Sequence, residues 1–325
     1  MMKRLIPLTI ALLATFTLWA QDDVNFEFSD GIEAGAVKTK MEQGTSRLLT
    51  AINRAERTGG DINYSGIDID NLASQSIGIL WNNVHFRISD DDIVEHCLRI
   101  KTSSGSLISY QVRNIAIEMK PLDNSYEGDT YQEICINYDK TGRITDFNIA
   151  MGLQQYSNLM RDGLRLDDMD RRMQILHWVE QFRNAYVQKD LQFMDAVFSE
   201  DALIVTGKVI KRLPGDGMKP VAEVEYTSMG KQQYLKNLKG VFQRNGYINV
   251  KFDDITIVRH PTKKNFYGVT LKQGWFTKTY HDEGIVFIVW DFSDELHPKI
   301  LVRTWQPMEV NEGDVFTLNS FKFNE

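Results

Sequence analysis

The first half of the chain changes its hydrophobic spacing from that of helices to that of strands. Apolar residues recur every three or four positions over residues 32–57, which predicts a helix that ends at Gly59-Gly60. The same spacing predicts a shorter helix over residues 70–81. The spacing then falls to two, and this alternation predicts strands over residues 84–88, 93–101, 107–119, 131–138 and 144–151. Residues 21–30, before the first helix, are interpreted as a polar lead-in.

The second half follows the same plan. A helical stripe that starts at Met173 and reaches Tyr186 predicts a long helix, and a short helix is predicted over residues 191–198. A strand over residues 201–209 is followed by an exposed insertion over 213–226 and a helix over 232–243. Four strands are predicted to finish the chain, over residues 248–258, 266–276, 284–292 and 299–306.

Two halves that each place helices before a run of antiparallel strands predict an α+β fold. We place the boundary in the stretch 154–170, which contains Gly163 and the acidic run 167–170, and expect modules at residues 21–160 and 161–325. More than 300 residues also exceed the usual size of a single core, which favours two domains.

The N-terminus has the pattern of a secretion signal. Lys3 and Arg4 precede an uncharged apolar run that ends at Ala20, and polar, acidic sequence follows. The run spans about 15 residues, whereas a membrane-spanning helix needs about 20. We therefore expect residues 1–20 to be a cleaved signal peptide, with an uncut anchor as the alternative, and we expect the protein in the periplasm or cell envelope.

Charge and cysteine content narrow the range of partners. The chain carries 37 basic and 44 acidic residues, so its net charge is −7. An acidic chain without a local basic stripe repels a phosphate backbone, so we expect no nucleic-acid partner. The only cysteines, Cys97 and Cys135, both lie in the first half. They could form a disulfide or remain two buried free thiols, and we favour the free thiols.

Several motifs in the second half resemble one family. They are Trp178-Val-Glu-Gln-Phe-Arg-Asn-Ala-Tyr186, then Lys189-Asp190, then Phe198-Ser-Glu-Asp-Ala202, and finally Arg303-Thr-Trp305. This order resembles the nuclear transport factor 2-like (NTF2-like) superfamily, which includes the SnoaL-like and ketosteroid-isomerase-like proteins. The resemblance covers residues 172–306. Residues 30–152 share only the order of elements and the hairpin at 138–144.

The resemblance implies two tandem cone-shaped modules, each a strongly curved antiparallel sheet wrapped around helices, with a cavity at the wide end. Members of the superfamily include isomerases, dehydratases, cyclases and non-catalytic binding modules, so the fold alone does not choose a function. Enzymes of this fold use a carboxylate beside a donor inside the cone.

Strand and helix periodicity suggests one pocket in the second module. We predict that Tyr186, Trp275, Asp291, Arg303 and Trp305 line it, with Asp291 and Arg303 facing each other across a hairpin. The alternative is that the aromatic residues belong to the core and the two charges form a structural ion pair.

The sequence gives little support for metal binding, phosphate binding or nucleophilic catalysis. We find no histidine or cysteine spacing typical of a metal site, no glycine-rich phosphate loop and no nucleophile motif, so we expect no metal and no cofactor. The sequence therefore favours an exported, non-catalytic protein that binds a small apolar ligand or an envelope protein partner. An isomerase- or dehydratase-like enzyme and a purely structural scaffold remain alternatives, and a homodimer is compatible with either.

Overall fold

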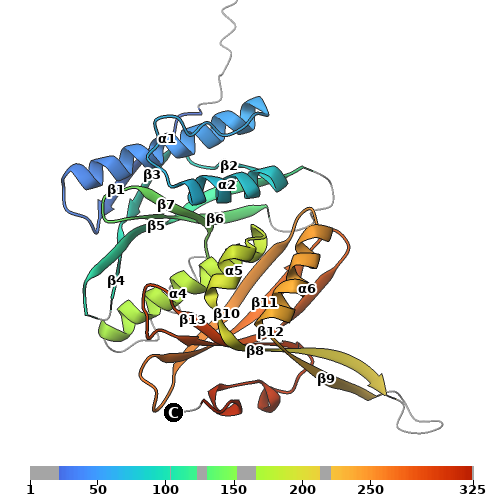
Figure 1. The fold of residues 1–325 in the computed structure, drawn as a ribbon. Helices are drawn as coiled ribbons and strands as arrows, with labels where there is room; N and C mark the ends of the chain where they lie inside the picture. Colours follow the sequence, from blue (N-terminus) through green and yellow to red (C-terminus); the bar gives the residue numbers. More distant parts are fainter. Residues whose placement is uncertain (1–21, 103, 123–129, 152–165, 213–220, 324–325) are drawn as a thin grey trace, which may run out of the picture.

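A computed structural model describes residues 22–102, 104–122, 130–151, 166–212 and 221–323. These residues form two curved sheets, of five and six strands, each with its own helices, and a separate two-stranded sheet (Figure 1). The α+β class and the arrangement in two modules are as the sequence predicts. The boundary expected near residue 160 lies outside the described residues and remains a prediction.

The N-terminal sheet is antiparallel and has the strand order β2-β5-β6-β7, with β4 paired to β5. Helices α1 (Ala36–Thr58) and α2 (Asn71–Asn83) cover one of its faces (Figure 1). Helix α1 buries Met41, Leu48, Leu49 and Ile52, which recur at helical spacing, and this stripe attaches it to the sheet. The strands are β2 (Val84–Ile88), β4 (Leu98–Lys101), β5 (Leu107–Pro121), β6 (Tyr131–Tyr138) and β7 (Ile144–Ile149).

Two features of this module differ from the sequence prediction. The supposed polar lead-in contains a strand, β1 (Asn25–Asp30), in which Phe26 and Phe28 alternate with polar residues and are buried. It pairs in parallel with β3 (Asp92–His96). The single strand expected at 93–101 is therefore divided at Cys97: β3 pairs with β1, and β4 pairs with β5.

Both cysteines are buried free thiols, so the structure contains no bond between Cys97 and Cys135. Cys135 lies in β6, but Cys97 lies between two strands rather than within one. Burial raises the pKa of the Cys97 thiol to about 12 and that of Cys135 well above its usual value. Neither thiol is therefore ionised or reactive at neutral pH.

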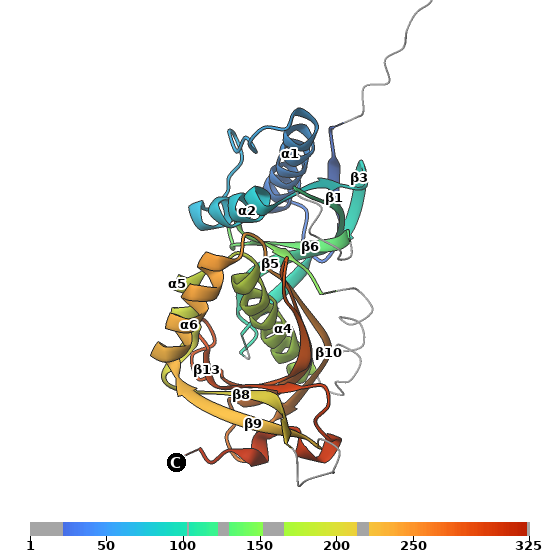
Figure 2. The ribbon, with the colours of Figure 1, turned by 90° about the vertical axis from the view of Figure 1, so that its right-hand side faces the viewer.

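The C-terminal sheet has the order β10-β11-β12-β13-β8-β9 and is antiparallel except for the β13–β8 pair. It curves around helix α4 (Leu166–Val187), while α5 (Leu191–Val197) and α6 (Lys231–Arg244) lie along its open side (Figure 2). The strands are β8 (Phe198–Arg212), β9 (Val221–Gly230), β10 (Asn249–Arg259), β11 (Phe266–Phe276), β12 (His281–Asp291) and β13 (Lys299–Pro307).

Helix α4 and the insertion also differ from expectation. The helix begins at Leu166, so the acidic run at 167–170 belongs to its first turn rather than to a linker. Residues 221–226 of the expected insertion belong to strand β9, which pairs with β8 along its whole length.

The last residues cover the outer face of the C-terminal sheet. Two short 3-10 helices, η1 (Glu312–Asp314) and η2 (Leu318–Ser320), follow β13, and Leu318 packs there with Phe287, Val289 and Val302. These residues form a second, smaller core outside the curve of the sheet. The inner face packs into the main core, which is shared by both modules.

Helix α4 lies between the two sheets, and its two sides differ in chemistry. Ile175, Val179 and Phe182 pack into the core. Glu180, on another side, is 2% exposed and forms a two-pronged ion pair with Arg113 of β5, at 2.6 and 2.5 Å. Its Oε1 also accepts the backbone N–H of Met151 at 2.7 Å. The modules are therefore joined by buried polar contacts whose charges are matched.

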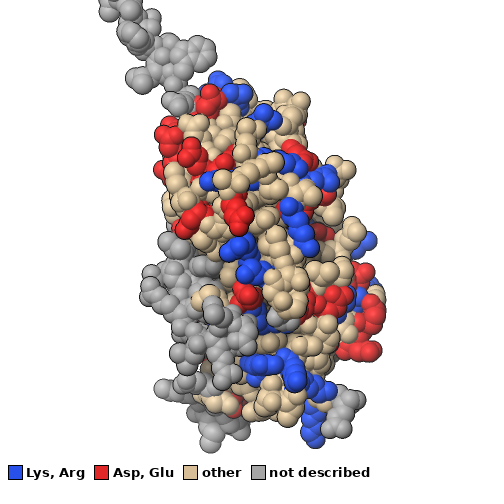
Figure 3. Space-filling view, turned by 90° about the vertical axis from the view of Figure 1, so that its left-hand side faces the viewer, with Lys and Arg blue, Asp and Glu red and all other residues tan. Residues whose placement is uncertain are grey.

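The surface carries charged side chains of both signs, as the composition indicates. On the face drawn in Figure 3, Lys and Arg side chains are interspersed with Asp and Glu over both modules. Among the described residues, no helix is both long enough and apolar enough to cross a membrane.

Candidate functional site

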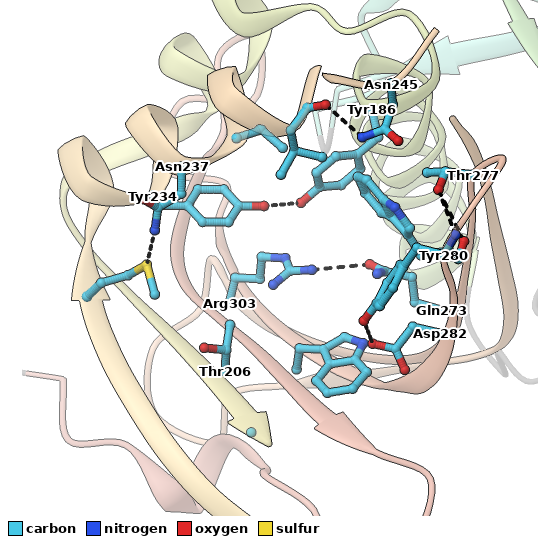
Figure 4. Close-up of a pocket in the computed structure, with 16 residues that line it drawn as sticks. Tyr186, Thr206, Tyr234, Asn237, Asn245, Gln273, Thr277, Tyr280, Asp282 and Arg303 are labelled. Carbon is cyan, nitrogen blue, oxygen red and sulfur yellow. Dashed lines mark hydrogen bonds between the residues drawn. The ribbon is translucent and has the colours of Figure 1, made fainter. Parts of the chain in front are cut away.

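A cavity of about 550 Å³ lies in the C-terminal module, between the inner face of the sheet and helices α4 and α6 (Figure 4). Its deep residues are buried, whereas Tyr280 and Asn237 at its rim are exposed, so the cavity opens to solvent on that side. The lining combines aromatic rings with polar groups. It comprises Tyr186, Thr206, Gly207, Met229, Tyr234, Asn237, Leu238, Val241, Asn245, Gln273, Trp275, Thr277, Tyr280, Asp282, Arg303 and Trp305.

Four of the five residues selected from the sequence line this cavity: Tyr186, Trp275, Arg303 and Trp305. Tyr186 comes from α4, Trp275 from β11, and the other two from β13. The convergence expected from the sequence is therefore observed for these four residues.

Asp291 does not lie in the cavity, and it does not face Arg303. In the β12–β13 ladder Arg303 pairs with Ile288, and Asp291 pairs with Lys299 at the end of the strand. Asp291 therefore shares the outer face with Phe287 and Val289. Its Oδ1 accepts hydrogen bonds from the backbone N–H and the hydroxyl of Ser293, at 2.8 and 2.6 Å, which is a local turn.

A β-bulge accounts for part of this error. The register shifts between Val289 and Trp290, and Leu301 is the extra residue on β13. Leu301 consequently packs on the outer cluster while Arg303 faces inward, although simple alternation places both on one face. A shift of one residue exchanges the faces of a strand, and the sequence pattern did not reveal this one.

Arg303 is the central charged residue of the cavity. Its side chain is buried, at 5% exposed, and Nη2 donates to Oε1 of Gln273 at 3.2 Å. The guanidinium carbon lies 6.0 Å from the ring centre of Tyr186 and 5.6 Å from that of Tyr234. Nε is buried and has no hydrogen-bond partner among the described residues.

The two tyrosines form a pair above Arg303, as Figure 4 shows. Their hydroxyl oxygens are 2.5 Å apart, so one donates to the other. Burial raises the pKa of Tyr186 well above its usual value, against the opposing effect of Arg303. Burial would by itself lower the pKa of Arg303, but the tyrosines outweigh this and raise it. Tyr186 is therefore neutral and Arg303 is charged at physiological pH.

The rim of the cavity carries its acidic group. Tyr280 donates its hydroxyl to Oδ2 of Asp282 at 2.6 Å, and Tyr280 itself is 56% exposed. Burial, together with Asp282, raises the pKa of Tyr280 to about 12, so the phenol keeps its proton. Asp282 faces Trp275 across the β11–β12 ladder, which directs it to the same side of the sheet.

Sequence reasoning did not select several of these residues. Tyr234 lies on the apolar stripe of α6 with Leu238 and Phe242, a pattern that indicates core packing rather than a site. Gln273 shares a strand face with Trp275, so alternation alone could have identified it. Nothing in the local sequence indicates that Tyr234 and Tyr186, 48 residues apart, share a hydrogen bond.

Within the described parts of the chain, no group of three His, Cys, Asp or Glu side chains could hold a metal ion. The chemistry of the cavity is therefore that of one guanidinium, amide and hydroxyl groups, two indoles and one rim carboxylate.

The comparisons with known proteins find similarities among solved structures only. No family model matches the chain, and no curated protein matches it. Among solved structures, an NTF2-like protein from Cytophaga hutchinsonii is 13% identical, matches 42% of this chain and 98% of its own, and has a TM-score of 0.31. An NTF2-like superfamily protein from Salmonella enterica is 12% identical, with 44% and 96% covered and a TM-score of 0.32.

A longer match is Bd1075 from Bdellovibrio bacteriovorus, which covers 71% of this chain and 78% of its own at 14% identity and a TM-score of 0.34. The matches thus include NTF2-like proteins, as the sequence resemblance implies, and most cover about the length of one module. At these identities the likeness concerns the fold alone, so function must be argued from the site.

Proposed function

We propose that this protein is exported and that its C-terminal module binds a small molecule in the cavity without converting it. The observation that carries the proposal is the cavity itself: about 550 Å³, open on one side and walled by two indoles and two tyrosines around a buried arginine. Small-molecule sites have this size and this combination of apolar walls with few polar groups.

The open rim favours binding over a purely structural role. A scaffold needs a closed, filled core, because an unfilled space forfeits packing contacts. Here Trp275 and Trp305 are only partly buried beside a core that is otherwise closed. A ligand would complete their burial.

Among the described residues that line the cavity, the one carboxylate is Asp282 at the rim, and this favours a non-catalytic role for the interior around Arg303. Asp291, which would have supplied the carboxylate, lies on the other face of the sheet. One observation favours the enzymatic alternative: Asp282 and Tyr280 place a carboxylate next to a phenol at the rim. If an isomerase- or dehydratase-like activity exists, Asp282→Asn should abolish turnover while ligand affinity is retained.

A bulky side chain inside the cavity tests binding directly. Thr206 points into the cavity from β8, so Thr206→Phe should fill it. The neutral fluorescent probe N-phenyl-1-naphthylamine should bind the wild type with enhanced emission, and Thr206→Phe should weaken binding at least tenfold. Thr256→Phe, at an exposed position of β10, is the matched control and should bind as the wild type does. Equal binding by all three proteins would refute the cavity as the site.

The exported location rests on the N-terminal sequence, since residues 1–20 lie outside the described part of the chain. N-terminal sequencing of the protein from its native envelope should give a chain that begins near Gln21. A membrane-bound chain that starts at Met1 would contradict this.

A further inference from the structure

The cavity contains a buried charge that the protein does not neutralise. Arg303 is 5% exposed, and none of the described residues places a carboxylate at ion-pair distance from it. Burial of an unpaired charge is strongly unfavourable, and proteins normally pair such a group or surround it with hydrogen bonds. Arg303 therefore requires an explanation that ordinary core packing does not provide.

The contacts that Arg303 does make compensate it only in part. Gln273 and the side chain of Tyr186 offer neutral hydrogen-bond partners, and the faces of Tyr186 and Tyr234 offer weak attraction to a cation. Nε remains buried without an acceptor among the described residues. A guanidinium has five N–H donors in a planar fork, and a carboxylate satisfies two of them at once.

The surroundings of Arg303 direct an anion to it. Asp282 is the one carboxylate among the lining residues, and it accepts the Tyr280 hydroxyl at the rim, where Tyr280 is 56% exposed. The interior thus carries a positive charge. An anionic group that reaches the interior gains a charge-assisted contact with Arg303.

The walls around this position indicate the rest of the ligand. Trp275 of β11 and Trp305 of β13 are partly buried, and Leu238 of α6 adds an apolar side chain to the lining. Aromatic side chains recognise flat apolar groups by stacking and edge contacts. The space therefore suits an aromatic or similarly flat apolar body.

We propose that the ligand is a small aromatic or apolar carboxylic acid whose carboxylate pairs with Arg303 inside the cavity. This inference rests on the proposed function, because it names the chemical class that the same cavity takes. Gln273 is a positioning residue in this arrangement, since it holds Nη2 and fixes the plane of the guanidinium.

Two probes of equal shape separate the charge from the apolar body. The affinities of 2-naphthoate and 2-naphthamide are measured by calorimetry with the wild type, Arg303→Met and Arg303→Lys. The wild type should bind the acid about ten- to a hundredfold more tightly than the amide, as expected for a charge-assisted pair. Arg303→Met should bind both equally, and Arg303→Lys should keep a reduced preference because its ammonium lacks the planar fork. Arg259→Met, which removes an exposed arginine of the same module, should retain the full preference.

The outcomes distinguish this inference from the proposed function. Equal affinity of the wild type for acid and amide, with loss of both in Thr206→Phe, would overturn the carboxylate but leave the binding cavity in place. Binding of neither probe at millimolar concentration, together with no binding of the neutral dye, would overturn both. The wild-type comparison needs no variant, so the inference remains testable even if Arg303→Met does not fold.

Discussion

Two of the four arginines that are buried in the described part of the chain have opposite surroundings. Arg113, at the contact between the modules, is 3% exposed and holds Glu180 through two hydrogen bonds. Arg303, in the C-terminal cavity, is 5% exposed and is held by one amide and two aromatic rings. The same residue type at nearly the same depth is thus neutralised in one place and left for a partner in the other. The difference distinguishes a residue that stabilises the fold from one that is available for binding.

The largest effect is expected at the neutralised arginine. Arg113→Met leaves the Glu180 carboxylate buried without its partner and should lower the free energy of unfolding by about 3–5 kcal/mol. Urea denaturation followed by circular dichroism measures this. The control is the exposed pair Arg54–Asp23, 59% and 68% exposed at the side chains, where Asp23→Asn should cost less than about 1 kcal/mol. Equal losses of unfolding free energy in Arg113→Met and Asp23→Asn would show that the Arg113–Glu180 pair does not stabilise the fold as a buried, neutralised contact.

A smaller effect is expected from the pH dependence of a second contact between the modules, in which Asp146 accepts a hydrogen bond from Gln181 of α4. Burial raises the pKa of Asp146 from 3.8 to about 6, against hydrogen bonds from Asn148, Asn137 and Gln181. The folded state therefore holds this proton more tightly than the unfolded state. Its contribution to stability is present at about pH 4 and is lost as the pH rises through about 6.

Asp146→Asn isolates this contribution because it removes the titrating group. The stability of the wild type relative to Asp146→Asn should fall by about 1–3 kcal/mol between pH 4 and pH 7. Unfolding curves for both proteins at the two pH values provide the difference. A difference that stays constant, or that rises with pH, would show that Asp146 is not a buried acid in this contact.

The smallest effect is expected at Asp291. Its carboxylate accepts the backbone N–H and hydroxyl of Ser293 in an exposed turn, so Asp291→Asn should cost less than about 1 kcal/mol. The affinity for 2-naphthoate should not change. A loss of binding in this variant would return Asp291 to the site and would mean that the β12–β13 register is different from that described.

The fold could be predicted from the sequence wherever the pattern is local and regular. The stripe of α1, the alternation in β11 and the order of elements all appear in the structure at nearly the predicted positions. The errors have local causes. Strand β1 is short and mostly polar at its exposed positions, and β9 follows a glycine-rich stretch that hides its pattern.

The site was predictable only in part, for a related reason. Periodicity places Trp275, Trp305 and Arg303 on the inner face, because strand alternation depends on nearest neighbours. It does not reveal the bulge at Leu301 that determines which residues of β12 face β13. It also does not indicate which charges are paired across long distances, such as Arg113 with Glu180, 67 residues away. Which charged residues pair with each other depends on the tertiary packing of the whole chain.

The most direct test of the central claim is the unfolding free energy of the wild type and Arg303→Met with and without saturating 2-naphthoate. Without the acid Arg303→Met should be at least as stable as the wild type, because the substitution removes a buried charge that has no ionic partner. At a hundred times the dissociation constant the wild type should gain about 2.7 kcal/mol, and Arg303→Met at the same concentration should gain much less. If Arg303→Met instead loses several kcal/mol without the acid, and the acid stabilises neither protein, Arg303 is part of the fold and not a binding residue.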